Sequence, residues 1–243
     1  MTSSPANEIT ILHLYPRDMN IYGDNGNLQV LTKRLEWHGY APTVIEYNPG
    51  DEFPHSFDII VGGGGQDSGQ DRIHQDLLSI GTSLKQAAEN GTPMLMVCGL
   101  YQLFGHRFVT ATGSILEGIG IFDAETIGTK ERLVGNIVLE TELFGSVVGY
   151  ENHSGQTSLG PQAQPFGTVR LGAGNNSTDG HEGVLYKNVI GTYLHGPILP
   201  KNPAIADFLI STAATNRYGS FTGVEIDDSI ALEAKRIAQS RPR

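Results

Sequence analysis

The sequence predicts an α/β fold with a mixed, mostly parallel sheet flanked by helices. In the first hundred residues, short apolar runs alternate with longer stretches of helical periodicity, the pattern of a doubly wound sheet. The 31 glycines indicate many tight turns, and 39% hydrophobic residues are enough for a compact core. We expect one domain over residues 1–243, with residues 1–8 as a flexible tail.

The expected elements follow in chain order. Apolar or β-branched runs bounded by Gly, Pro or Asn predict strands at residues 9–14, 43–47, 57–61 and 93–97. Asp24 or Asn25 is placed to cap a helix that continues to Trp37 and stops at Gly39, and a second helical pattern runs from Ile73 to Ala88.

The second half is richer in strands. Short strand-like runs at 135–139, 147–150 and 189–194 are separated by Gly, Asn and Ser turns. Asn202 and Pro203 open a helix through Ala213, and a last helix is expected over 230–238, with Asp228 or Ser229 as its cap.

Charge and composition exclude several classes of protein. A net charge of −10 with only 16 Lys and Arg argues against a nucleic-acid surface, which needs clustered basic residues. The single cysteine cannot form an internal disulfide, residues 1–8 lack a secretory pattern, and no apolar run approaches membrane-spanning length. We therefore expect a reducing compartment, the cytoplasm.

Cys98 stands at the strongest local signal. It follows the apolar run 93–97 and precedes Gly99 and an amphipathic helical segment. Such a strand-to-helix elbow lifts a nucleophile above the sheet edge, and the helix N-terminus favours the thiolate. The alternative is a buried, inert cysteine, which is the commoner role of an isolated thiol.

His195 is the best candidate for the base that a thiol nucleophile needs. It ends the apolar run 189–194 and is followed by Gly196 and Pro197, which force a turn. If the strands before Cys98 and His195 are parallel neighbours, both side chains lie at one sheet edge. Among the other histidines, those at positions 38, 55, 74 and 106 are expected at the surface, and His13 in the core or at a strand end.

Four consecutive glycines, Gly62–Gly65, follow the strand at 57–61. They spell neither a Walker A loop nor a dinucleotide fingerprint, so they leave a flexible backbone that can approach a substrate oxygen. The amides of Gly64 and Gly99 are candidates for an oxyanion hole; the alternative is a plain turn.

The remaining candidate residues are few. The sequence has no spacing of residues that is typical of a metal site. Arg132 is placed to grip a carboxylate, unless it is an ordinary surface arginine.

Five stretches of the chain together resemble a known family, the glutamine amidotransferases of the cobyric-acid-synthase type, and within it the GatD-type subunits of lipid II isoglutaminyl synthases. The stretches cover residues 14–27, 60–67, 97–105, 149–157 and 191–202. The resemblance implies the flavodoxin-like class I amidotransferase fold. It also implies that Cys98 forms a glutamyl thioester, that His195 is the base, and that Gln102 and Arg132 bind glutamine. Residues 151–153 match a family motif without individual roles.

The resemblance further implies a partner. Many relatives carry His-x-Glu, whereas position 197 here is proline, so an aspartate from a Mur-ligase-like subunit (MurT-like) is expected to orient His195. Leu100 also replaces a glycine of the commoner relatives. No cofactor is expected in this chain: ATP and Mg²⁺ belong to the partner, which would activate the D-glutamate of the lipid II stem peptide for amidation to D-isoglutamine. An amidase or glutaminase acting with another acceptor, and a non-catalytic binding subunit, remain alternatives.

Overall fold

A computed structural model describes residues 7–242. Of the expected tail at residues 1–8, residues 1–6 lie outside the described part, and Glu8 already begins the first strand, so the tail does not extend to residue 8. Its first layer is a six-stranded sheet in the order β11-β12-β4-β3-β1-β2. The strands are β1 (Glu8–Leu14), β2 (Ala41–Tyr47), β3 (Ile59–Gly62), β4 (Met94–Val97), β11 (Val184–Tyr186) and β12 (Val189–Thr192). All neighbours pair in parallel except β11 with β12, which confirms the predicted mixed, mostly parallel sheet.

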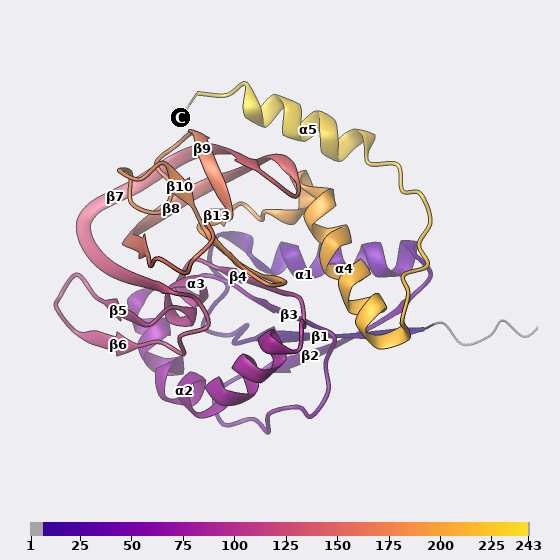
Figure 1. Cartoon of the computed structure of the whole chain (residues 1–243), viewed down its shortest axis with the longest axis horizontal. Coiled ribbons are helices and arrows are strands. Elements are labelled where there is room, and N and C mark those ends of the chain that lie inside the picture. The colour runs from indigo at the N-terminus through magenta and orange to yellow at the C-terminus, as the bar shows by residue number, and fades with distance from the viewer. Residues whose placement is uncertain (1–6, 243) are drawn as a thin grey trace, which may run out of the picture.

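Helices connect and flank this sheet (Figure 1). They are α1 (Asn25–Trp37), α2 (Asp67–Glu89), α3 (Gly99–Phe104) and α4 (Pro203–Tyr218), with short 3-10 segments η1 (Ile21–Gly23) and η2 (Leu199–Lys201). α5 (Ser229–Gln239) lies at the edge of the molecule and has no buried residue. The apolar strands are fully buried, as β3 and β4 show throughout, because helices or loops cover both faces of a parallel sheet.

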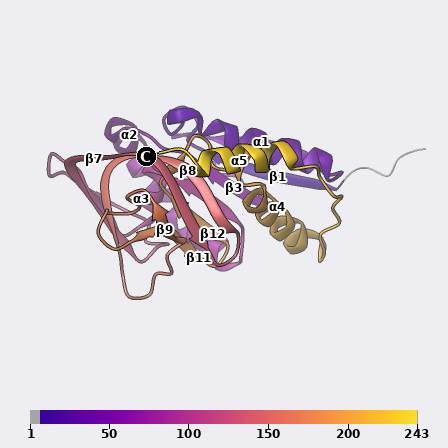
Figure 2. The ribbon, with the colours of Figure 1, turned by 90° about the horizontal axis from the view of Figure 1, so that it is seen from above.

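A second sheet contains the strand-rich half. It is built from β5 (Arg107–Val109), β6 (Ile115–Glu117), β7 (Ala124–Thr141), β8 (Gly145–Leu159), β9 (Gly167–Leu171), β10 (His181–Glu182) and β13 (Leu194–His195). β7 and β8 form a long antiparallel ribbon. Figure 2 shows this ribbon at one end of the molecule, and β1 with α1 and α4 at the other.

Asp24 and Asp228, each one of two alternatives expected to cap a helix, do not cap it with their side chains. Asp24 and Asp228 stand at the N-cap positions of α1 and α5, but neither side chain makes a capping hydrogen bond. The Asp228 carboxylate instead accepts from buried Arg34 at 2.6 Å, because an ion pair with a guanidinium outweighs a bond to a peptide N–H. Within the described residues, no helix is long and apolar enough to cross a membrane.

Two of the four histidines that were expected at the surface are buried. His38 and His74 are buried, whereas His55 and His106 are exposed as expected, and His13 is buried in β1. His38 packs edge-on against Phe221, and His74 contacts the carbonyl oxygen of Glu117 at 2.9 Å. His74 lies on the buried face of α2, and His38 is the C-cap residue of α1. Other parts of the protein cover both side chains, which their polar neighbours in the sequence do not indicate.

Candidate active site

Cys98 occupies the predicted elbow between β4 and α3. Its backbone is in the left-handed region, with φ 51° and ψ −102°, where a residue with a side chain is strained. The Cys98 N–H donates to the carbonyl of Thr192 at 2.8 Å, which holds the turn against the end of β12. Strain held in this way is typical of a nucleophile elbow, where it turns the side chain out of the sheet.

His195 lies at the same sheet edge as Cys98. β12 pairs in parallel with β4, so that Thr192 is opposite Val97, and both chains leave the sheet there. A Cβ built on Gly64 would stand 2.8 Å from Cε1 of His195 and 3.0 Å from Cβ of Cys98. Thiol and imidazole therefore flank the same small glycine, as the parallel-neighbour argument predicted.

The orienting acid for this histidine comes from the chain itself. Oδ1 of Asp24 is 3.1 Å from Nδ1 of His195, and both side chains are almost fully buried. The expectation that the base lacks an in-chain acid is therefore wrong. Asp24 precedes α1, 171 residues from His195 in the sequence, so a search for His-x-Glu cannot find it.

The surroundings of His195 favour its charged form. Burial alone lowers the pKa of the imidazole, but the negative charge of Cys98 and the hydrogen bond to Asp24 outweigh it and raise the pKa to about 10. Nε2 is buried and has no hydrogen-bond partner among the described residues. It is the nitrogen left for a proton exchanged with sulfur, water or substrate.

The glycine run corrects one of the two predicted oxyanion donors. The N–H of Gly64 donates to Oδ2 of Asp24 at 2.7 Å, so it is already used to fix the acid. The next residue, Gly65, lines the cavity beside Cys98, and its nitrogen lies 3.1 Å from the point where a Cβ on Gly99 would stand. The amide of Gly64 is therefore not available as an oxyanion donor, whereas Gly65 and Gly99 lie next to each other beside Cys98.

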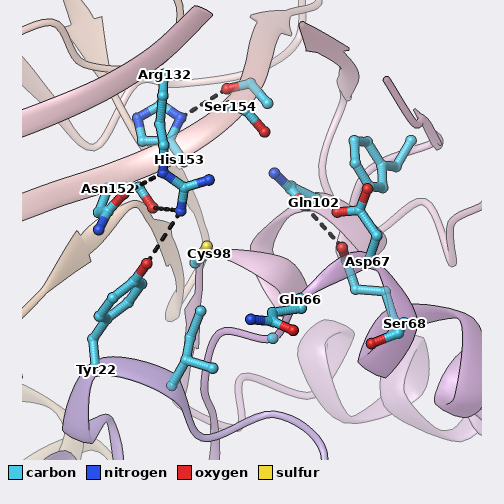
Figure 3. A pocket seen from close by; sticks show the side chains of 15 residues that line it. Tyr22, Gln66, Asp67, Ser68, Cys98, Gln102, Arg132, Asn152, His153 and Ser154 are labelled. Carbon is cyan, nitrogen blue, oxygen red and sulfur yellow. Dashed lines mark hydrogen bonds between the residues drawn. The ribbon is translucent and has the colours of Figure 1, made fainter. Parts of the chain in front are cut away.

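A cavity of about 480 Å³ opens above the sulfur (Figure 3). Three of the predicted site residues, Cys98, Gln102 and Arg132, line it together. Arg132 stands where the register of β7 against β8 shifts, between Gly128 and Leu133, and this irregularity turns its side chain toward the cavity. Its Nε donates to Oδ1 of Asn152 at 2.6 Å, and its Nη2 to the hydroxyl of Tyr22 at 3.1 Å.

Comparison with known proteins identifies the family to which this site belongs. Residues 10–203 match the family model described as the CobB/CobQ-like glutamine amidotransferase domain. The chain belongs to the family of CobB/CobQ-like glutamine amidotransferases.

Two relatives in this family match nearly the whole chain. One is the lipid II isoglutaminyl synthase (glutamine-hydrolyzing) subunit GatD of Staphylococcus aureus, 41% identical over 96% of each chain. The subunit of the same name from Streptococcus pneumoniae is 40% identical over 87% of this chain and 83% of its own. A solved glutamine amidotransferase, 15% identical, superposes with a TM-score of 0.60 over 84% of this chain and 98% of its own, which shows the fold.

Gln102, which the resemblance assigned to glutamine binding, is buried in this site, and its amide already has protein partners. Its side chain is buried and has partners at both ends: Oε1 accepts from Gln70 at 2.8 Å, and Nε2 donates to the hydroxyl of Tyr193 at 3.2 Å. In this arrangement Gln102 forms part of the cavity floor, where its amide is held by the protein.

The family motif at residues 151–153 supports the site from the β8 side. Glu151 is buried and accepts from the N–H groups of Ala173 and Gly174 at 2.8 and 2.9 Å. His153 lines the cavity and stacks flat on Tyr193, with ring centroids 3.6 Å apart. Burial lowers the pKa of His153 to about 4, so this imidazole is neutral beside the charged His195.

Glu182 is a further buried acid that the sequence did not single out. It accepts from the hydroxyl of Thr192 at 3.0 Å and from the N–H of Tyr193 at 2.6 Å, in the segment that leads to His195. Burial raises the pKa of Glu182 to about 8, although these hydrogen bonds lower it. The carboxyl is therefore mainly protonated at neutral pH, and it holds the end of β12 in place.

Proposed function

We propose that this chain is the glutaminase subunit of a lipid II isoglutaminyl synthase. Cys98 hydrolyses glutamine through a glutamyl thioester, and the ammonia passes to a MurT-like, ATP-dependent ligase that amidates the D-glutamate of the lipid II stem peptide to D-isoglutamine. The observation that carries the proposal is the Cys98–His195–Asp24 arrangement beside a polar cavity. The likeness to the two GatD subunits along almost the whole chain supports the choice of acceptor.

The residues present account for both half-reactions. In the first, the sulfur of Cys98 attacks the side-chain amide carbon of glutamine, and protonated His195 gives its proton to the leaving nitrogen, so that ammonia departs and the thioester remains. In the second, neutral His195 takes a proton from water, the hydroxide oxygen attacks the thioester, and glutamate and the thiolate are released. The amides of Gly65 and Gly99 stabilise the oxyanion of each step.

Recognition of glutamine is assigned to Arg132. A guanidinium matches a carboxylate in charge and in geometry, and this one reaches into the cavity from the β7 side, across from the glycine loop. We assign the α-carboxylate of glutamine to it. Because Arg132 and Cys98 line the same cavity, one glutamine molecule can present its α-carboxylate to the guanidinium and its side-chain amide to the sulfur.

The acceptor chemistry is assigned to a second subunit, which holds ATP and Mg²⁺. The names of the two relatives describe them as subunits of a synthase, and a Mur-ligase-like partner supplies the carboxylate activation that amide synthesis requires. Because Asp24 already occupies Nδ1 of His195, we do not assign the orienting acid to that partner. Docking can still control activity by closing the cavity.

Reconstitution tests the proposal. The full chain, co-purified with the MurT-like subunit, should amidate lipid II with ATP and glutamine. Cys98→Ala should abolish the glutamine-dependent reaction and leave the reaction with free ammonium intact, since only the nitrogen supply is removed. Loss of both reactions in a correctly assembled complex, or unchanged use of glutamine, would contradict the assignment. Ammonia release from other amides and not from glutamine would favour an amidase.

A further inference from the structure

Tyr22 is an aromatic residue in a conformation that costs free energy. It lies in η1 with φ 55° and ψ 21°, in the left-handed region that bulky side chains avoid, and its side chain is 47% exposed. No buried core contact explains the strain, since a half-exposed ring gains little from burial. A strained, exposed residue that lines a cavity indicates a constraint from function.

The two contacts of Tyr22 join the base to the binding arginine. Its ring packs edge-on against the imidazole of His195, with centroids 4.9 Å apart and planes at 70°. Its hydroxyl accepts a hydrogen bond from Nη2 of Arg132 at 3.1 Å. Figure 3 shows the side chain reaching from η1 to the arginine across the side of the cavity that holds Cys98.

The partners of Arg132 show what this link achieves. Nε is held by Asn152 and Nη2 by Tyr22, so the guanidinium plane is fixed at two points. Nη1 has no hydrogen-bond partner among residues 7–242 and is left for a ligand. A long side chain fixed before the ligand arrives loses less rotamer entropy on binding, which improves affinity.

We propose that Tyr22 is a positioning residue for glutamine recognition: packed on His195, it holds Arg132 at the place where the α-carboxylate binds while the amide lies at Cys98. This rests on the proposed glutaminase function. Tyr22 takes no part in bond making. It fixes the position of Arg132 relative to His195. The site therefore selects substrates whose α-carboxylate lies at the correct distance from the amide that is cleaved.

Two thiol reagents applied to the full chain separate recognition from reactivity. 6-Diazo-5-oxo-L-norleucine carries the α-amino acid group of glutamine, and it alkylates a thiolate with loss of N₂ after its diazo carbon takes up a proton. Iodoacetamide alkylates the same sulfur without an α-carboxylate. In Tyr22→Phe, the half-saturating concentration of the diazo reagent should rise about tenfold, the effect of one lost hydrogen bond to a charged group. The maximal labelling rate and the rate with iodoacetamide should stay within about twofold.

Tyr150→Phe is the matched control, because Tyr150 is similarly exposed on neighbouring β8 and does not line the cavity. It should leave both reagents unaffected. Equal half-saturation in Tyr22→Phe and the wild type, or an equal slowing with both reagents, would overturn the role of Tyr22. A wild-type chain whose Cys98 does not react selectively with the diazo reagent would instead overturn the glutaminase function itself.

Discussion

The carboxylate of Asp24 connects His195 to the glycine loop beside Cys98. One of its oxygens lies 3.1 Å from Nδ1 of His195, and the other accepts the N–H of Gly64 at 2.7 Å. The same buried side chain therefore orients the imidazole and fixes the glycine run one residue before Gly65. The orienting acid of a Cys–His pair sets the tautomer of the histidine and stabilises its charged form.

We therefore expect Asp24→Asn to lower kcat for glutamine hydrolysis by on the order of a hundredfold or more, with a smaller change in KM. The asparagine oxygen can still accept from Gly64, but the side chain no longer carries the charge that favours imidazolium. The measurement is steady-state glutamate formation by the assembled complex.

Asp18→Asn is the control for this substitution, because Asp18 precedes η1 and its carboxylate pairs with exposed Arg72 at 2.6 Å. It should keep kcat near the wild-type value. Full activity in Asp24→Asn would show that another acid, for example one from the partner subunit, orients His195.

The sequence alone was sufficient to predict the elbow, and it placed Cys98 and His195 at one sheet edge on the condition that their two strands are parallel neighbours, which the structure shows. Apolar runs ending at Cys98 and just before His195 are local signals, and parallel neighbours necessarily end at one edge. Asp24 was not predictable in this way. A polar residue before a helix has the same appearance whether it caps the helix or turns away from it, and here the buried histidine competes for the carboxylate.

The pKa of Glu182 predicts a pH-dependent stability difference. Between the ordinary pKa of 4.5 and about 8, the folded chain retains a proton that the unfolded chain has released. The free energy of unfolding therefore falls as pH rises through this range. Glu182→Gln removes the ionisation and keeps the shape.

Urea unfolding of both proteins at several pH values tests this expectation. The stability of Glu182→Gln relative to the wild type should increase from pH 4.5 to 8 and become constant above it. A difference that is independent of pH would show that Glu182 titrates normally in the folded protein.

Arg132→Lys should raise KM for glutamine about tenfold to a hundredfold, with a smaller effect on kcat. Lysine keeps the charge but lacks the planar fork, so it cannot hold Asn152, Tyr22 and a carboxylate together. Arg107→Lys is a matched control, since Arg107 pairs with Glu125 and both side chains are exposed. Unchanged KM in Arg132→Lys, measured in the same glutaminase assay, would remove Arg132 from the binding site.

Gly65→Ala should lower kcat on the order of a hundredfold, because the new methyl displaces the amide that we propose as an oxyanion donor. Its Cβ would stand 2.4 Å from the sulfur of buried Met19, so the loop has to shift. Adding Met19→Ala to this variant should restore part of the activity, since it removes the clash.

Gly113→Asn is the control for the loop variant. It lies at an open turn with φ 89° and nothing within 4 Å, in a conformation that asparagine tolerates. It should leave kcat unchanged. If Gly65→Ala is fully active, the amide of Gly65 is not an oxyanion donor.

Gly65, Gln102 and Arg132 show why the role of a single residue could not be predicted from the sequence. The run of four glycines located the loop but not which amide faces the cavity, because that depends on where Asp24 lies. Gln102 was placed correctly beside Cys98, yet its amide is held by Gln70 and Tyr193, from two distant segments. Arg132 was predicted either to grip a carboxylate or to be an ordinary surface arginine, and an irregularity inside β7 places it in the site.

The covalent intermediate tests the account most directly. The complex should be mixed with labelled glutamine, quenched in acid within one turnover, digested and analysed by mass spectrometry. We predict one glutamyl group in thioester linkage on the peptide that carries Cys98, and none in Cys98→Ala. Rapid glutamate formation with no adduct on Cys98, or with the adduct on another residue, would contradict the central claim that this thiol is the nucleophile.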